Sequence, residues 1–243
     1  MKTLYCNGDS FIFGMECSAD HSRNESNKEL SFAGYVRTAL SCSTYINNAY
    51  SGASNDFIFR TTVEDLVKLE KSGTSPSDVF VIIGWTSLDR SMIAASAFPA
   101  TNLIEEATDH NVIFVNPGFR ANLISEFSDG ASNLAMKVVP FLVNNIWTEA
   151  VQLPTHQAQV LCLEEFLKSK GYQYVFVATC GNYDNFTMLQ DSVHWFWPLE
   201  KTFANWAFKN HNSHVRAEHH FDAETHDEFG KLLVDYITEN KLY

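Results

Sequence analysis

Ser10 is the side chain whose position most directly indicates chemistry. It follows Gly8-Asp9, a turn sequence that ends a predicted strand at residues 2–6. A serine directly after a strand, on a glycine-containing turn and at the start of a helix, presents its hydroxyl beside backbone N–H groups that can hold an oxyanion. The alternative is an ordinary helix N-cap, for which Asp and Ser are favoured residue types. Taken alone, this short motif favours the cap.

A nucleophilic serine needs a base, and the candidates gather near the C-terminal end. A neutral imidazole takes the serine proton, and a carboxylate or carbonyl must hold the other ring nitrogen. The histidines and acids of this stretch are His211, His214, Glu218, His219, His220, Asp222 and His226. Such a cluster also fits a solvated loop or a metal site, but it contains no HxH or HExxH spacing that would fix a metal geometry. We therefore expect no metal.

Two further polar segments follow predicted strands. Ser51-Gly52 lies beyond a predicted strand at residues 44–47, and Thr86 follows the apolar run at residues 79–84. A run that is apolar throughout is expected for a central parallel strand covered on both faces. Parallel strands bring their carboxyl ends to one edge, where such sheets bind ligands. These segments are therefore predicted to meet Ser10 at that edge.

The elements that must position this edge alternate along the chain. Helices are predicted at residues 29–40, 57–69, 157–170, 199–209 and 223–239, and a further strand at residues 174–179. This alternation predicts an α/β fold with a mostly parallel sheet and helices on both faces. The length of 243 residues fits one domain over residues 1–243, with an insertion or lid at about 91–150.

The order of these motifs resembles that of the SGNH (GDSL-like) hydrolases. Gly8-Asp9-Ser10 matches the first block of that family, and residues 48–56 (Asn-Ala-Tyr-Ser-Gly-Ala-Ser-Asn-Asp) are similar to the second. The resemblance implies the SGNH hydrolase fold, a flavodoxin-like three-layer α/β/α sandwich, with Ser10 as nucleophile and Asp9 beside it in the site. It also implies that the N–H of Gly52 contributes to the oxyanion hole. The motifs are similar to those of SGNH-like proteins from tailed phages.

The third block departs from the family pattern, which is usually Gly-x-Asn-Asp with an asparagine that donates to the oxyanion. Here Thr86 stands in the place of that asparagine. The hydroxyl of Thr86, the charge of Arg90 and the side chain of Asn55 are the candidate replacements, and Trp85 is the aromatic residue expected to face the substrate. Loss of one such donor typically costs about 10²–10³ in rate. The departure therefore bears on efficiency and not on the reaction class.

The last block of the family places an acid two or three residues before the base, ahead of a final helix. Aligned in this way, His220 is the base, Glu218 is its acid, and His226 lies on the first turn of the helix. A competing alignment makes His226 the base and Asp222 the acid. We favour His220 because it lies in the loop before the helix, where the base of the family lies.

Charge and cysteine content argue against several classes of protein. The chain has 17 Lys and Arg against 29 Asp and Glu, a net charge of −12, which disfavours nucleic acid and anionic lipid as partners. The five cysteines are odd in number and form no CxxC pair, so neither a disulfide framework nor a zinc site is expected. Without a signal-like or membrane-spanning apolar stretch, the expected location is the cytoplasm, that of the host if the protein is viral.

Together these features predict a serine hydrolase that needs no cofactor and cleaves a small or carbohydrate-linked ester. Two alternatives remain open. An acyltransferase on the same fold would hydrolyse weakly, with turnover that rises when an acceptor alcohol is added. A non-catalytic binding protein would keep its activity after Ser10→Ala. The sequence carries no signature of the acyl group, of the pathway or of the oligomeric state.

Overall fold

A parallel sheet forms the centre of the molecule. The computed structural model describes residues 2–18, 24–94, 112–115, 148–186, 192–198, 200–216 and 220–243. Within these ranges the sheet has five strands: β1 (Thr3–Asn7), β2 (Thr44–Asn47), β3 (Val79–Trp85), β6 (Gln173–Ala178) and β7 (Trp195–Phe196). Their order is β2-β1-β3-β6-β7, and every neighbouring pair is parallel. This is the flavodoxin-like doubly wound order, so the predicted α/β fold is confirmed.

Strand β3 lies in the middle of the sheet. All of its residues are buried, as is typical of a strand covered on both faces. Its Ile82 is in register with Cys6 of β1 on one side and with Val175 of β6 on the other. This register brings the carboxyl ends of the three strands to the same edge.

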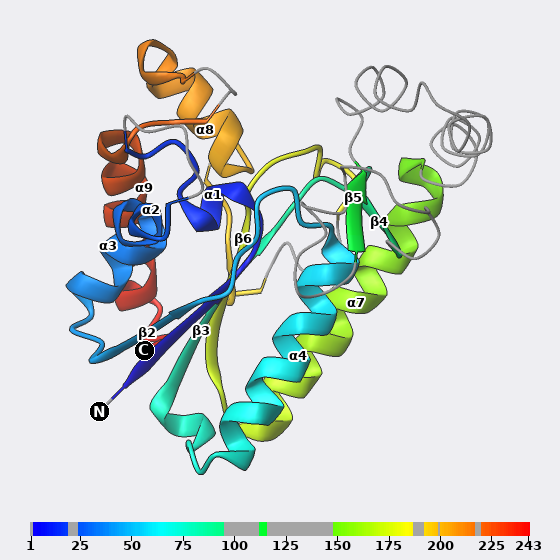
Figure 1. The fold of residues 1–243 in the computed structure, drawn as a ribbon, viewed down its shortest axis with the longest axis vertical. Helices are drawn as coiled ribbons and strands as arrows, with labels where there is room; N and C mark the ends of the chain where they lie inside the picture. The colour runs from blue at the N-terminus through cyan, green and yellow to red at the C-terminus, as the bar shows by residue number, and fades with distance from the viewer. Residues whose placement is uncertain are drawn as a thin grey trace.

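Helices cover both faces of the sheet (Figure 1). On one face α4 (Asn55–Lys71) lies beside α7 (Glu149–Lys170). On the other face α3 (Phe32–Ala39) packs on α9 (Ala223–Glu239), accompanied by α1 (Ser10–Phe13), α2 (Ser26–Leu30) and α8 (Phe203–Asn210). Successive strand side chains point to opposite faces, so Leu4 joins the core beneath α9 whereas Tyr5 joins the core beneath α4. The fold therefore has the three layers that were predicted.

Smaller elements complete the described chain. Two 3₁₀ turns span Pro76–Asp78 and Asn212–His214. Strands β4 (Ser91–Ala94) and β5 (Val112–Val115) pair antiparallel in a sheet of their own. They are the described strands of the segment that we predicted to be an insertion or lid, most of which lies outside the described residues. Among the helices that the structure describes, none has the length and apolar character needed to span a lipid bilayer.

Candidate active site

The carboxyl ends of β1, β3 and β6 bring three polar segments together. Ser10 lies just beyond β1, Thr86 directly follows β3, and Thr179-Cys180 directly follows β6. The loop after β2 is tied to the first of these segments, because Tyr50 N donates a 3.0 Å hydrogen bond to Gly8 O. The meeting of these segments at one edge is what the strand order requires.

Ser10 is the first residue of α1, a helix of four residues. Asp9 caps this helix, since its Oδ1 accepts a hydrogen bond from Phe11 N at 3.0 Å. Gly14 ends the helix in the left-handed region, with φ 79°, and its N–H returns to the Ser10 carbonyl. Ser10 is 3% exposed, and within the described residues no hydrogen bond engages its hydroxyl. Asp9 is therefore the N-cap of α1, and this leaves the hydroxyl of Ser10 available as a nucleophile.

Asp9 is a buried clamp between three strands. Its side chain is 0% exposed, and Oδ2 accepts hydrogen bonds from Thr86 Oγ1 at 2.7 Å and from Thr179 Oγ1 at 2.9 Å. Arg90 Nη1 forms an ion pair with the same oxygen at 3.1 Å. A carboxylate in this position is tolerated because charged and hydroxyl donors surround it. Asp9, which we had assigned to the substrate site, instead fixes the strand ends that carry Ser10.

Thr86 and Asn55 do not serve as the side-chain oxyanion donors that we expected. The hydroxyl of Thr86 has one hydrogen, and it is directed to the Asp9 carboxylate, which can only accept. The Asn55 amide pairs with the Thr86 backbone: Nδ2 donates to Thr86 O at 3.0 Å and Oδ1 accepts from Thr86 N at 2.9 Å. Both side chains therefore hold the end of β3 against α4.

Two further predicted site residues lie at the same edge. The guanidinium of Arg90 pairs with Asp9 through Nη1, and its contribution of charge to an oxyanion stays a prediction. Trp85, which was expected to face the substrate, is 0% exposed and packs edge-on against the rings of His156, at 5.1 Å, and Phe176, at 5.8 Å. The reason is that β3 is covered on both faces, so its last residue still belongs to the core beneath α7.

Two backbone donors remain for an oxyanion. Neither the N–H of Ser10 nor that of Gly52 is bonded to another described residue. Gly52 adopts φ 84°, a left-handed conformation that favours glycine. The loop that carries it runs alongside the first block, because Asn48 N donates to Cys6 O at 2.9 Å, ahead of the Tyr50–Gly8 bond.

His220 packs against the short helix that begins with the candidate nucleophile. Its ring is 5.3 Å from that of Phe11, the residue after Ser10. Its side chain is 13% exposed, and Nδ1 lies 3.4 Å from the carboxylate of Glu16. Glu218, the acid that the resemblance implies, lies outside the described residues. No hydrogen bond joins the Ser10 hydroxyl to a ring nitrogen of His220 within the described chain, and apo sites often have such catalytic contacts open.

The competing alignment, with His226 as base and Asp222 as its acid, is not formed. His226 is 0% exposed, its ring stacks on Phe32 at 5.7 Å, and its Nδ1 accepts from Phe32 N at 3.2 Å. An accepting Nδ1 puts the proton of the neutral ring on Nε2, which leaves no basic nitrogen. Burial lowers the pKa of His226 to about 3. His226 is therefore a neutral histidine of the core.

The other histidines of the C-terminal cluster pair with acids at α9. His214 Nδ1 lies 2.7 Å from Asp222, which also caps the helix by accepting from Thr225 N. His211 Nε2 lies 3.4 Å from Glu228. Across the described parts of the chain, no group of three His, Cys, Asp or Glu side chains is arranged to hold a metal ion. His219 lies outside those parts.

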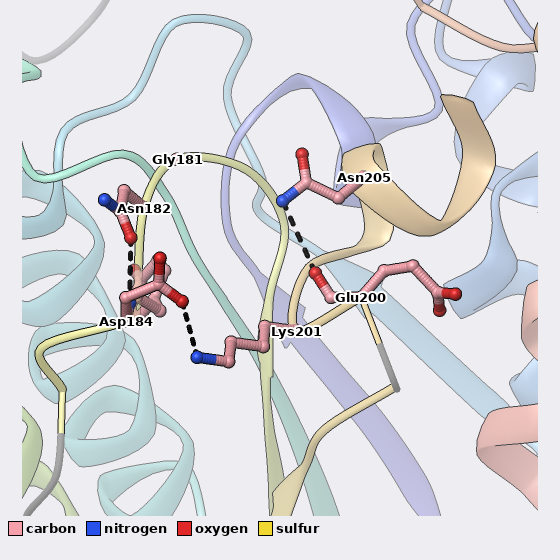
Figure 2. A pocket seen from close by; sticks show the side chains of 7 residues that line it. Gly181, Asn182, Asp184, Glu200, Lys201 and Asn205 are labelled. Atoms are coloured by element: carbon pink, nitrogen blue, oxygen red, sulfur yellow. Dashed lines mark hydrogen bonds and ion pairs between the residues drawn. The ribbon is translucent and has the colours of Figure 1, made fainter. Parts of the chain in front are cut away.

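A polar pocket of about 300 Å³ opens just beyond β6 (Figure 2). It is lined by Gly181, Asn182, Tyr183, Asp184, Glu200, Lys201 and Asn205. In Figure 2, Lys201 reaches across to Asp184, with which it forms an ion pair, and Asn205 on α8 donates to Glu200 O at 3.4 Å. The pocket adjoins the Asp9 clamp because Cys180, which precedes Gly181, places its Sγ 3.5 Å from Asp9 Oδ2. No sequence pattern indicated this pocket, because loop residues have no periodicity.

The sheet and the serine at its edge define a doubly wound α/β protein with a candidate nucleophile. The chain belongs to the family described as Family of unknown function (DUF6071), whose model matches residues 15–192. That match includes neither Ser10 nor His220. A comparison with curated proteins found no match.

Several solved structures are similar in their overall arrangement. They include a G-D-S-L family protein from Desulfitobacterium hafniense DCB-2 (11% identity, all of both chains, TM-score 0.47). The psychrotrophic esterase EstA from Pseudoalteromonas sp. is 10% identical over 99% of this chain and 97% of its own, with a TM-score of 0.47. The acetyl xylan esterase Axe2 from Geobacillus stearothermophilus is 13% identical over 97% and 94%, with a TM-score of 0.36. Similarity this distant assigns no chemistry, so function has to be inferred from the residues of the site.

Proposed function

We propose that this protein is a serine hydrolase of the esterase or deacetylase type, with Ser10 as nucleophile and His220 as base. The observation that carries the proposal is the approach of His220, from the loop before α9, to the short helix that begins with Ser10. Helix α1 begins directly beyond β1, at the carboxyl edge of a parallel sheet, where doubly wound folds bind their ligands. The sequence resemblance to SGNH hydrolases supports the same pair.

The chemistry would proceed in two steps. Ser10 Oγ attacks the ester carbonyl carbon while Nε2 of His220 removes the hydroxyl proton. The bond to the alcohol then breaks, and the alcohol leaves with that proton, so that the acyl group is bound to Ser10. In the second step His220 takes a proton from water, the resulting hydroxide attacks the acyl carbon, and Ser10 recovers its proton as the carboxylic acid leaves.

The negative oxygen of each tetrahedral intermediate would be held by the N–H groups of Ser10 and Gly52. Because Thr86 and Asn55 are committed to Asp9 and to the backbone, the hole would have two donors and no side-chain donor from these residues. We therefore expect a slow esterase. The charged and amide side chains of the pocket at residues 181–184 and 200–205 favour a polar alcohol such as a sugar, since they can donate to hydroxyls and accept from them.

The test is hydrolysis of p-nitrophenyl acetate and butyrate by the wild type, Ser10→Ala, His220→Ala and His226→Ala, with fluorophosphonate labelling read by mass spectrometry. We expect Ser10 to be labelled, and turnover to be lost with Ser10→Ala and His220→Ala. His226→Ala, the matched control, should keep catalysis at a temperature where it is folded. A wild type that neither turns over nor labels would overturn the proposal and favour a non-catalytic binding protein. Turnover that rises with an added acceptor alcohol would identify acyl transfer.

A further inference from the structure

Glu16 presents a carboxylate that the two-step chemistry above does not use. The residue is 1% exposed, and its Oε2 lies 3.4 Å from Nδ1 of His220. A buried carboxylate is costly unless cations or hydrogen-bond donors compensate it. The imidazole N–H lies within ion-pair distance of this carboxylate but forms no hydrogen bond with it in this structure. The imidazolium that forms during acyl transfer is a cation that compensates the buried carboxylate. The contact therefore stabilises His220 most in its protonated form.

The backbone at Glu16 favours a different residue type. Glu16 has φ 63° and lies in a turn that Cys17 N closes by donating to Gly14 O at 3.0 Å. Positive φ suits glycine or asparagine and is costly for a residue such as glutamate. A carboxylate therefore stands where the local backbone would favour a small residue. Backbone strain of this kind is found at functional sites more than elsewhere.

This turn is continuous with the helix of the candidate nucleophile. Met15 N donates to Ser10 O at 2.9 Å, so Ser10 and Glu16 are fixed in one short unit. His220 is held separately, by the bridge between Val215 and Phe221 and by Arg216 N, which donates to His220 O at 2.8 Å. The imidazole thus contacts two residues of a single tight turn of chain, the ring of Phe11 and the carboxylate of Glu16.

We propose that Glu16 is the positioning residue of His220. During acyl transfer its carboxylate accepts the Nδ1–H, a hydrogen bond that the 3.4 Å separation leaves open in this structure. This contact keeps the proton on Nδ1 and leaves the lone pair of Nε2 for the hydroxyl of Ser10. This inference rests on the proposed function and names the acid of that site. It moves the acid from Glu218, where the family resemblance puts it, to the turn after the nucleophile. His226, which also lies near His220, adds no charge because burial keeps it neutral.

The decisive comparison is between Glu16→Gln and Glu218→Gln, two isosteric changes of one glutamate each. We expect Glu16→Gln to lower kcat for p-nitrophenyl acetate by about 10⁴, the loss seen when the acid of a serine triad is replaced by its amide. KM should change by less than about threefold, because the acid does not contact substrate. The rising limb of its kcat/KM profile should also move to lower pH, since loss of the carboxylate destabilises the imidazolium. Glu16→Asp should recover part of kcat.

Glu218→Gln should stay within about threefold of the wild type, because the acid is supplied elsewhere. The opposite pattern, with kcat lost in Glu218→Gln and kept in Glu16→Gln, would overturn the role of Glu16 and leave the proposed function standing. Hydrolysis that survives Ser10→Ala would overturn the proposed function instead.

Nitrogen-15 NMR of the imidazoles tests the contact without relying on activity or on any variant at position 16. In wild type or in Ser10→Ala, the neutral His220 ring should carry its proton on Nδ1. A neutral ring protonated on Nε2 would overturn the proposal, even if Glu16→Gln failed to fold.

Discussion

The hydroxyl of Thr86 donates a 2.7 Å hydrogen bond to Oδ2 of Asp9, the residue before the candidate nucleophile. Thr179 donates to the same oxygen from the end of β6, at 2.9 Å. The position of Ser10 is thus set by two threonine hydroxyls, one beyond each neighbouring strand, that both point at Asp9. These two threonines therefore stabilise the fold beside the candidate nucleophile, and the oxyanion donors that we propose are backbone N–H groups.

Thr86→Val should lower the free energy of unfolding by about 1–3 kcal/mol, because it removes a donor from a buried carboxylate. Thr86→Ser keeps the hydroxyl and should cost less. Urea unfolding measures both, and kcat should fall less than about tenfold in either variant, in contrast to the loss of an oxyanion donor. Thr179→Val is the matched control, since it removes the other hydroxyl from the same oxygen. A Thr86→Val variant that is as stable as the wild type but has kcat reduced by about 10²–10³ would show that Thr86 donates to the oxyanion.

Gly52→Ala should reduce both stability and catalysis. Alanine in the left-handed region costs roughly 1–2 kcal/mol, and relaxation of that strain would turn the N–H of residue 52 away from the oxyanion. Gly171→Ala is the control, because Gly171 has a similar φ of 82° at the end of α7 and an added Cβ would meet open space there. We expect similar losses in urea unfolding, but a fall in kcat only for Gly52→Ala. Equal kcat values for the two variants would remove Gly52 from the oxyanion hole.

Two buried histidines should make the protein sensitive to acid. Burial lowers the pKa of His226 and of His156 to about 3, whereas an imidazole in an unfolded chain titrates near pH 6.5. Below about pH 6.5 the unfolded state therefore binds protons that the folded state does not. Stability contributed by these neutral rings is complete above that pH and is lost as the pH falls towards 3.

His226→Gln should weaken this dependence, because glutamine does not titrate and can still accept from Phe32 N. We expect the variant to lose less stability than the wild type between pH 7 and pH 5, as measured by urea unfolding at each pH. His214→Gln is the control, because the pKa of His214 is shifted in the opposite direction: its hydrogen bond with Asp222 raises it. Loss of this histidine should therefore not weaken the acid sensitivity. If the free energy of unfolding changed with pH in the same way in the wild type and in His226→Gln, His226 would not be a neutral histidine of the core.

The fold could be predicted because its signals are local. The apolar run of β3, the turn residues after β1 and the alternation of strands with helices each specify an element with little help from the rest of the chain. The start of α7 could not be predicted in this way. We placed it at residue 157, after Pro154, but the helix begins at Glu149 and continues through the proline. A proline removes one helical hydrogen bond, and the packing of α7 on α4 offsets that loss.

The site was harder to predict, because its contacts join residues that are distant in the sequence. Ser10 was proposed as nucleophile from its position after a strand, and His220 as base from its position before the last helix. Nothing local distinguishes Trp85, which is buried, from a residue at a pocket rim. A strand that is apolar throughout has no exposed face, so the sequence does not show towards which face each side chain points. Glu16 was missed entirely, because a single acid in a turn has no pattern, and its contact with His220 depends on the folded chain.

Helix α1 is fixed by Asp9 at one end and by Gly14 at the other, so any displacement of Ser10 also loosens the joint between β1, β3 and β6. The side chains of the adjoining pocket are tied to no strand end, since Asn182, Asp184 and Asn205 are exposed and their side-chain contacts within the described chain stay among the residues that line the pocket. Under the proposed function, single substitutions at these pocket positions should change which molecule is bound, while Ser10 keeps its place at the edge of the sheet.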